Sequence, residues 1–152
     1  MNKQLQRAML YFAVAAFCIP LSAFAELGGN PNSISNDRAK LKGSLQVVHA
    51  AAYDVHQMQL PSGIGVKEYV SPDGKVFAVS WQGQAIPNLK QLLGSYFEQY
   101  SRAASGSRRG HGPLLVQLPG LVVQSAGHAR AFVGRAYVPQ MIPQGVQLEA
   151  IR

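Results

Sequence analysis

The chain has 152 residues, of which 47% are hydrophobic and only 14% are charged. This length is enough for one domain of ordinary size, and the apolar content excludes a wholly disordered protein because it can offset the entropy of the chain. The 15 glycines and 9 prolines favour many turns and short strands over long helices.

Residues 1–25 have the pattern of a cleavable signal peptide. A short basic start precedes an almost unbroken apolar run from Ala8 to Leu21. Ala23 and Ala25 then supply the small-x-small site that signal peptidase requires. The apolar run is shorter than the roughly 20 residues that span a bilayer. We therefore expect cleavage after Ala25 and export to the periplasm or out of the cell.

Cleavage would change both the cysteine count and the charge of the chain. Cys18 lies inside the expected signal peptide, so the mature chain would lack disulfides, cysteine–zinc sites and thiol nucleophiles. Loss of Lys3 and Arg7 leaves 12 basic against 7 acidic residues. A basic exported protein meets anionic polysaccharides and lipid headgroups, so we expect such partners and no nucleic acid. No other stretch is apolar and long enough for a membrane span.

The mature chain begins with a breaker-rich segment. We expect residues 26–43 to be a flexible lead-in and residues 44–152 to form a single domain. From Ser44 onward, apolar and polar residues alternate as in a strand. The alternation changes phase between Val55 and Met58, which favours a bulge or two short strands.

A β-hairpin is predicted from two strand patterns, at residues 64–70 and 76–81. Between them, Ser71-Pro72-Asp73-Gly74 has strong turn chemistry, because proline presets one backbone angle and glycine tolerates a positive φ. Phe77, Val79 and Trp81 alternate along the second strand. We expect these three side chains to share one face that points into the core.

One amphipathic helix is predicted at about residues 88–103. Asn88 is a suitable N-cap, and Gly94 costs about 1 kcal/mol relative to alanine while allowing close approach to the sheet. Apolar residues recur at the spacing of one helical face, which we expect to pack on the hairpin: Leu89, Leu92, Leu93, Tyr96, Phe97 and Tyr100.

Four more strands are predicted after the helix, at residues 114–118, 121–125, 129–137 and 146–151. Ala126-Gly127 is the expected turn between the middle two. The expected fold is therefore α+β, an antiparallel sheet of short strands and hairpins packed on one amphipathic helix.

Several short motifs occur along the mature chain in a fixed order: Leu27-Gly28-Gly29, Val66 to Ser71, Gly74, Val76-Phe77, Trp81, Gly83, Pro87 to Leu89, Leu92 to Phe97, Gly120 to Val123, Gly127-His128 and Tyr137 to Pro139. With them the chain resembles the bacterial family of short exported proteins known as domain of unknown function 2844. The resemblance implies export and a single domain. It implies no reaction, cofactor or catalytic residue.

No metal, cofactor or catalytic motif is present. His49 and His56 are seven positions apart, which would place them on opposite faces of one continuous strand. His111 and His128 lie in or beside turns, and no spacing matches a metal-binding motif. A site built in space from histidines and Asp54 stays open as an alternative. No serine-nucleophile motif occurs.

The best binding candidates lie in the basic loop after the helix. Arg108 and Arg109, followed by His111, stand among glycines and serines. Two guanidinium groups there could bind phosphate or carboxylate groups of an envelope polymer. A merely solvated basic loop is the other interpretation.

The sequence thus favours a non-enzymatic exported module that binds or builds the cell envelope, contacting an anionic glycan or lipid. Two alternatives stay open. One is a hydrolase or metal-dependent enzyme with a site of histidines and carboxylates. The other is a subunit partner of another exported protein, which predicts a large exposed apolar patch.

Overall fold

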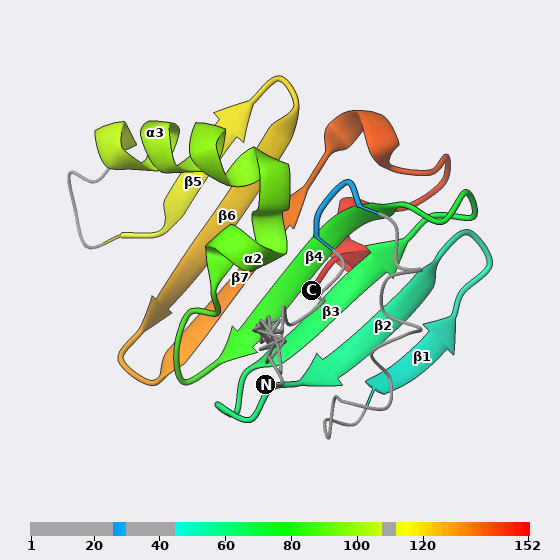
Figure 1. Cartoon of the computed structure of the whole chain (residues 1–152), viewed down its shortest axis with the longest axis horizontal. Coiled ribbons are helices and arrows are strands. Elements are labelled where there is room, and N and C mark those ends of the chain that lie inside the picture. Colours follow the sequence, from blue (N-terminus) through cyan, green and yellow to red (C-terminus); the bar gives the residue numbers. More distant parts are fainter. Residues whose placement is uncertain (1–25, 30–44, 108–111) are drawn as a thin grey trace, which may run out of the picture.

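The computed structural model describes residues 26–29, 45–107 and 112–152. Among them, seven strands form one antiparallel sheet in the order β1-β2-β3-β4-β7-β6-β5 (Figure 1). The strands are β1 (Leu45–His49), β2 (Asp54–Gln59), β3 (Gly65–Val70), β4 (Val76–Gly83), β5 (Leu114–Leu118), β6 (Leu121–His128) and β7 (Ala131–Tyr137). Together with the helical region described next, this sheet confirms the α+β prediction.

The predicted helix is present and covers one face of the sheet, the helix face. It consists of α2 (Leu89–Leu93), η2 (Gly94–Tyr96) and α3 (Phe97–Ser107). The Asn88 side chain caps α2 by accepting a hydrogen bond from the Gln91 N–H at 3.3 Å. The helical region runs to Ser107 instead of 103, and Gly94 breaks it with a positive φ of 52°. The Glu26 carboxylate occupies the space where a β-carbon of residue 94 would lie.

Residues 26–29 pack between α2 and the start of β4. Leu27 is only 1% exposed, and its N–H donates to the Leu92 carbonyl at 3.0 Å. The Gly28 N–H donates to the Val76 carbonyl at 2.8 Å. The start of the predicted lead-in is therefore docked on the domain instead of being loose. Residues 30–44 lie outside the described residues.

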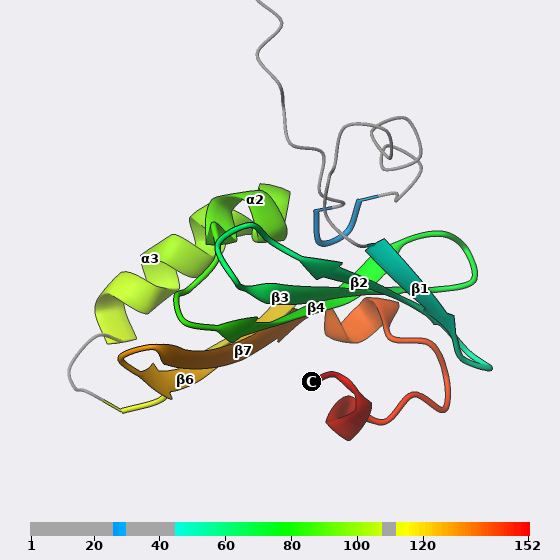
Figure 2. The same ribbon diagram turned by 90° about the horizontal axis from the view of Figure 1, so that it is seen from below.

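Residues 138–152, called the covering segment below, lie over part of the other face of the sheet, the segment face (Figure 2). The segment contains the short helices η3 (Pro139–Met141) and η4 (Leu148–Ala150). The predicted strand at 146–151 is therefore wrong. Carbonyl groups there accept hydrogen bonds from Arg135, and Ile151 is fully buried against the sheet.

Burial on both faces produces two hydrophobic clusters. The cluster on the helix face contains Val79 and Trp81 as predicted. Phe77 is an exception to the prediction, because it belongs to the segment-face cluster with Tyr69. Tyr69 pairs with Ala78 and Val70 pairs with Val76, so a bulge leaves Phe77 as an extra residue that turns to the other face.

The predicted hairpin of β3 and β4 is confirmed, with Gly74 at a φ of 74° in its turn. The Ser71 hydroxyl donates to the Asp73 carboxylate in this turn. This hydrogen bond holds the pKa of Asp73 below its ordinary value.

Two details of strand phase differ from the predictions. Strand β2 is regular and has no bulge. Val55 and Met58 differ in phase because they face opposite sides of the sheet, and both sides carry apolar packing. Ala126 and Gly127 pair with residues of β7 and are not a turn. The chain instead turns at residues 129–130, where Arg130 has a φ of 68°.

Trp81 of β4 lies across Gly134 of β7, and this contact gives the first testable prediction. A β-carbon at residue 134 would overlap the indole ring. We expect Gly134→Ala to lower the free energy of unfolding by about 1–3 kcal/mol, the usual cost of overpacking. Gly120→Ala is the control, since no described atom lies within 4 Å of its β-carbon position. Equal urea-unfolding curves for the two variants would contradict this assignment.

Candidate functional site

The strand register places one residue from each strand in a single line across the segment face. We call this line the polar row, although its β5 member is a leucine. Neighbouring strands lie roughly 4.8 Å apart, so seven strands give a row about 29 Å long. From β5 to β1 its members are Leu115, Gln124, Arg135, Ser80, Lys67, Gln57 and Gln46.

The next line of side chains along the strands is apolar and is covered. It includes Val122, Tyr137, Ala78, Tyr69 and Val55, all in the segment-face cluster. The covering segment packs on this line, so the polar row runs along the edge of that cover. Ser80, at the centre of the polar row, is the one buried member of the row.

A tyrosine hydroxyl fixes the end of the covering segment beside the polar row. Tyr69 Oη accepts a hydrogen bond from the Arg152 N–H and donates to the Arg152 carbonyl oxygen, both at 2.9 Å. Lys67 Nζ donates to the same carbonyl at 2.9 Å. Arg135 donates from Nη1 to the carbonyls of Leu148 at 2.6 Å and Ile151 at 3.2 Å.

The two cations of the polar row keep donors available. A lysine ammonium has three N–H donors, and Lys67 uses one of them within the described residues. Arg135 uses Nε toward Gln124 and Nη1 toward the covering segment. Its Nη2 group has no hydrogen bond to any described residue. Both cations can therefore hold the segment and still contact a ligand.

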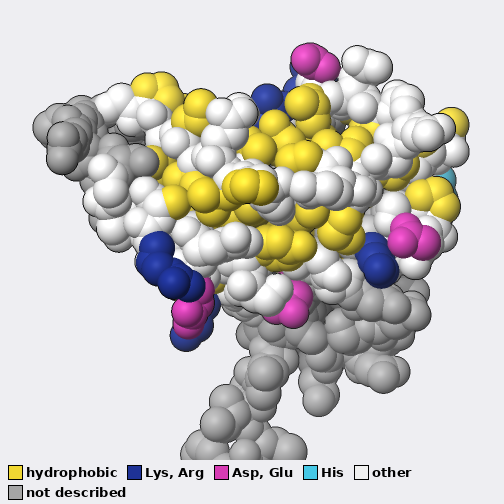
Figure 3. Space-filling view, turned by 90° about the horizontal axis from the view of Figure 1, so that it is seen from above, with side chains coloured by type: hydrophobic (Ala, Val, Ile, Leu, Met, Phe, Trp, Pro, Cys, Tyr) yellow, Lys and Arg dark blue, Asp and Glu magenta, His cyan; other side chains and the backbone are white. Residues whose placement is uncertain are grey.

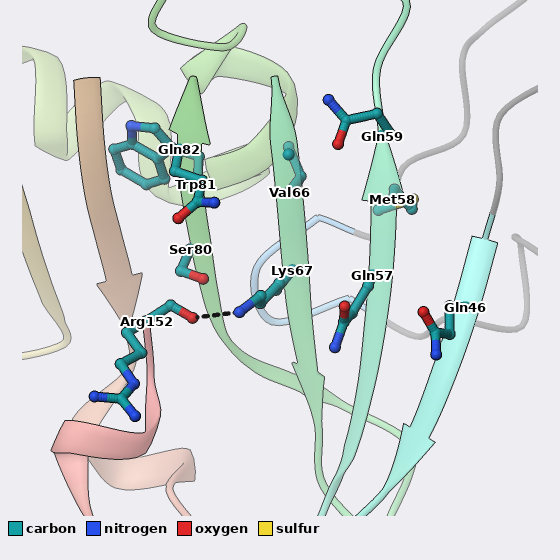
Figure 4. Close-up of a pocket in the computed structure, with 11 residues that line it drawn as sticks. Gln46, Gln57, Met58, Gln59, Val66, Lys67, Ser80, Trp81, Gln82 and Arg152 are labelled. Carbon is teal, nitrogen blue, oxygen red and sulfur yellow. Dashed lines mark hydrogen bonds between the residues drawn. The ribbon is translucent and has the colours of Figure 1, made fainter. Parts of the chain in front are cut away.

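A polar cavity of about 270 Å³ lies over the β1 to β4 part of the row. Figure 4 shows Gln46, Gln57 and Lys67 side by side on three neighbouring strands, with Arg152 beyond them. Gln59 and Gln82 border the same cavity. Its polar side chains are thus mainly primary amides, which both donate and accept hydrogen bonds.

An apolar cavity of about 560 Å³ lies over the β5 to β7 part of the same face. Leu115, Ala126 and Val133 form part of its wall together with Ile151 of the covering segment. Both cavities border Gln82 and Arg152. The two cavities therefore adjoin at Arg152, and together they are called the groove below.

Charge is divided between the two faces of the sheet. The strand carboxylates of the described residues, Asp54 and Glu68, both point to the helix face by register. No Asp or Glu side chain of the described residues lines either cavity, whereas the cationic side chains of Lys67, Arg135 and Arg152 do. The groove is therefore positive and suits an anion.

The binding residues predicted from sequence, Arg108, Arg109 and His111, lie outside the described residues, as do Ala23 and Ala25. Pro113, two positions after His111, lines the apolar cavity. Sequence reasoning missed the polar row, because its members are single residues in seven separate strands, six of them polar.

The histidines do not lie as the sequence predicted. β1 and β2 are two strands of a hairpin instead of one continuous strand, so His49 and His56 share the helix face. His49 Nδ1 lies 2.7 Å from the Asp54 carboxylate. Among the described residues, no group of three or more histidines, cysteines and carboxylates could hold a metal ion.

One end of the molecule carries a band of hydrophobic side chains, with charged side chains at its periphery (Figure 3). Half-buried hydrophobic residues, among them Leu118, Met141 and Val146, pack against the two buried clusters. Within the described ranges, no helix is long and apolar enough to cross a membrane.

Comparison with known proteins identifies one similarity. A family model described as "Protein of unknown function (DUF2844)" matches residues 23–151, nearly the whole chain. No curated protein and no solved structure matches it.

The anchoring role of Tyr69 gives the second prediction. Tyr69→Phe removes the hydroxyl that holds Arg152, and we expect it to lower the free energy of unfolding by about 1–3 kcal/mol. Amide hydrogen exchange at Arg152 should speed up, because its N–H loses its acceptor. Tyr53→Phe is the matched control, since Tyr53 stacks in the same aromatic group at 5.9 Å from Tyr69. Unchanged exchange at Arg152 in Tyr69→Phe would refute the anchor.

Proposed function

The chain belongs to the DUF2844 family, whose description names no activity, and from the groove itself we propose that the protein is an exported binding module of the cell envelope. Its proposed ligand is an anionic polysaccharide that lies along the polar row. The observation that carries this proposal is the row itself, which contains three glutamine amides and two cations and no Asp or Glu side chain.

The side chains of the row match the chemistry of an acidic sugar polymer. Glutamine amides such as Gln46 and Gln57 donate and accept, as sugar hydroxyls do, so each can pair with a hydroxyl in either sense. Lys67 and Arg135 supply cations for carboxylate or phosphate groups, and hydrogen bonds to charged groups are stronger than neutral ones.

The length of the row favours a polymer over a small molecule. All seven strands contribute a residue to it, and every member except the buried Ser80 is at least partly exposed. An extended ligand about 29 Å long can therefore contact the row on six of the strands. The signal-peptide pattern of residues 1–25 supports export, where acidic polysaccharides are abundant and nucleic acids are not. The His49–Asp54 pair lies on the opposite face and is no part of this site.

Arg108 and Arg109 extend the proposal beyond the sheet. They precede β5, the strand that carries the Leu115 end of the row. Their positive charge strengthens attraction to a polyanion.

The third prediction tests the row with polygalacturonate, an acidic polysaccharide, and with uncharged dextran as the control ligand. We expect polygalacturonate alone to bind. Lys67→Gln should weaken binding about tenfold, since it removes a charged donor, and Gln57→Ala about threefold. Lys90→Gln is the matched control, because it removes the same charge from α2 on the other face. Isothermal titration calorimetry measures all four affinities.

Equal affinity of Lys67→Gln and Lys90→Gln would contradict the proposal. Absence of binding to polygalacturonate and to other acidic envelope polymers would also refute it. The alternative of a partner subunit would then lead, with the hydrophobic band of Figure 3 as its contact surface.

The fourth prediction concerns the basic loop. We expect Arg108→Ser/Arg109→Ser to weaken polygalacturonate binding about threefold, the effect of two exposed ion pairs. The loss should disappear as salt rises, because exposed charges are screened beyond about 10 Å at 0.1 M ionic strength. A loss that persists at 0.5 M salt would show a structural effect of the variant instead.

A further inference from the structure

The apolar cavity holds side chains that the polysaccharide proposal leaves unexplained. Leu115 of β5 and Val133 of β7 are each 52% exposed, which makes them the most exposed large hydrophobic side chains among the described residues. Both line the apolar cavity, together with Ala126 and the buried Ile151. The groove thus joins an apolar end to a polar, positively charged end at Arg152.

We propose that this groove binds an anionic amphiphile, with an acyl chain in the apolar cavity and its acidic headgroup at Arg152. The inference rests on the proposed function and deepens it, because it makes the polysaccharide a lipid-anchored one. The glycan then continues from the headgroup along Lys67 and the glutamines of the polar cavity.

Charge and shape support an acyl chain as the occupant. The volume of about 560 Å³ lies within the range of small-molecule sites. Arg135 and Arg152 both line the apolar cavity, Arg152 also lines the polar one, and their guanidinium groups match an acidic headgroup. Of the described strands that line the cavity, β4, β6 and β7 are already paired on both sides, and β5 is an edge strand. A bound peptide would bring backbone polar groups that need partners, whereas an acyl chain brings none.

The fifth prediction uses dodecyl phosphate below its micelle concentration as the probe. We expect the purified protein to bind it at least tenfold more tightly than inorganic phosphate, which lacks the chain, or dodecyl maltoside, which lacks the charge. Leu115→Gln/Val133→Thr should weaken dodecyl phosphate binding about tenfold. Val133 lies outside the polar row, so Val133→Thr alone should leave polygalacturonate affinity unchanged. Val48→Thr/Ile86→Gln is the matched control, since both residues are exposed and line neither cavity.

A cavity-filling variant, Ala126→Leu, provides a second test that adds no polar group. We expect it to weaken dodecyl phosphate binding by the same factor of about ten. Thermal unfolding verifies that each variant is folded. Equal affinity for dodecyl phosphate and inorganic phosphate, or a folded Leu115→Gln/Val133→Thr with unchanged binding, would overturn the acyl-chain site. Loss of polygalacturonate binding alone, with dodecyl phosphate binding intact, would refute the polysaccharide and keep the amphiphile.

Discussion

The architecture depends on covering a sheet that is apolar on both faces. Helices α2 and α3 cover one face, and the covering segment has to bury the other with little regular structure of its own. A segment without a hydrogen-bonded ladder needs side-chain partners for its carbonyls. Tyr69, Lys67 and Arg135 provide them, and each stands on a strand where the register places it beside the segment. The same polar groups that hold the segment therefore create the positive lining of the groove.

Because the same side chains hold the covering segment and line the groove, the groove has two ends of different character. Where the segment ends, Arg152 lies between an amide-rich cavity over β1 to β4 and an apolar cavity over β5 to β7. The carboxylates of the strands point the other way, toward the helix face, where Asp54 pairs with His49 and Glu68 is fully buried. The strand register, and no local sequence motif, thus places the cations of the row on the segment face and the strand carboxylates on the helix face.

Local patterns in the sequence predict much of the fold, since the β3–β4 hairpin, the helix after Asn88 and strand β5 were each predicted near their observed bounds. Alternation fails where both faces are buried, which is why Val55 and Met58 looked out of phase. It also fails for residues 146–151, whose apolar side chains pack without a strand partner. The polar row was beyond prediction, because the β4–β7 pairing joins residues such as Ser80 and Arg135 that are distant in sequence.

The strand order has a consequence for how the chain folds. Every neighbouring pair of strands except β4 and β7 is also consecutive in sequence. Two meanders, residues 45–83 and 114–137, can therefore form from local contacts, which are reached quickly because short loops cost little entropy to close. Only their union at β4 and β7 requires a distant encounter, and there the Trp81 ring crosses Gly134. The pairing of β4 with β7 then sets the folding rate, and the complete groove forms only after these two strands have paired.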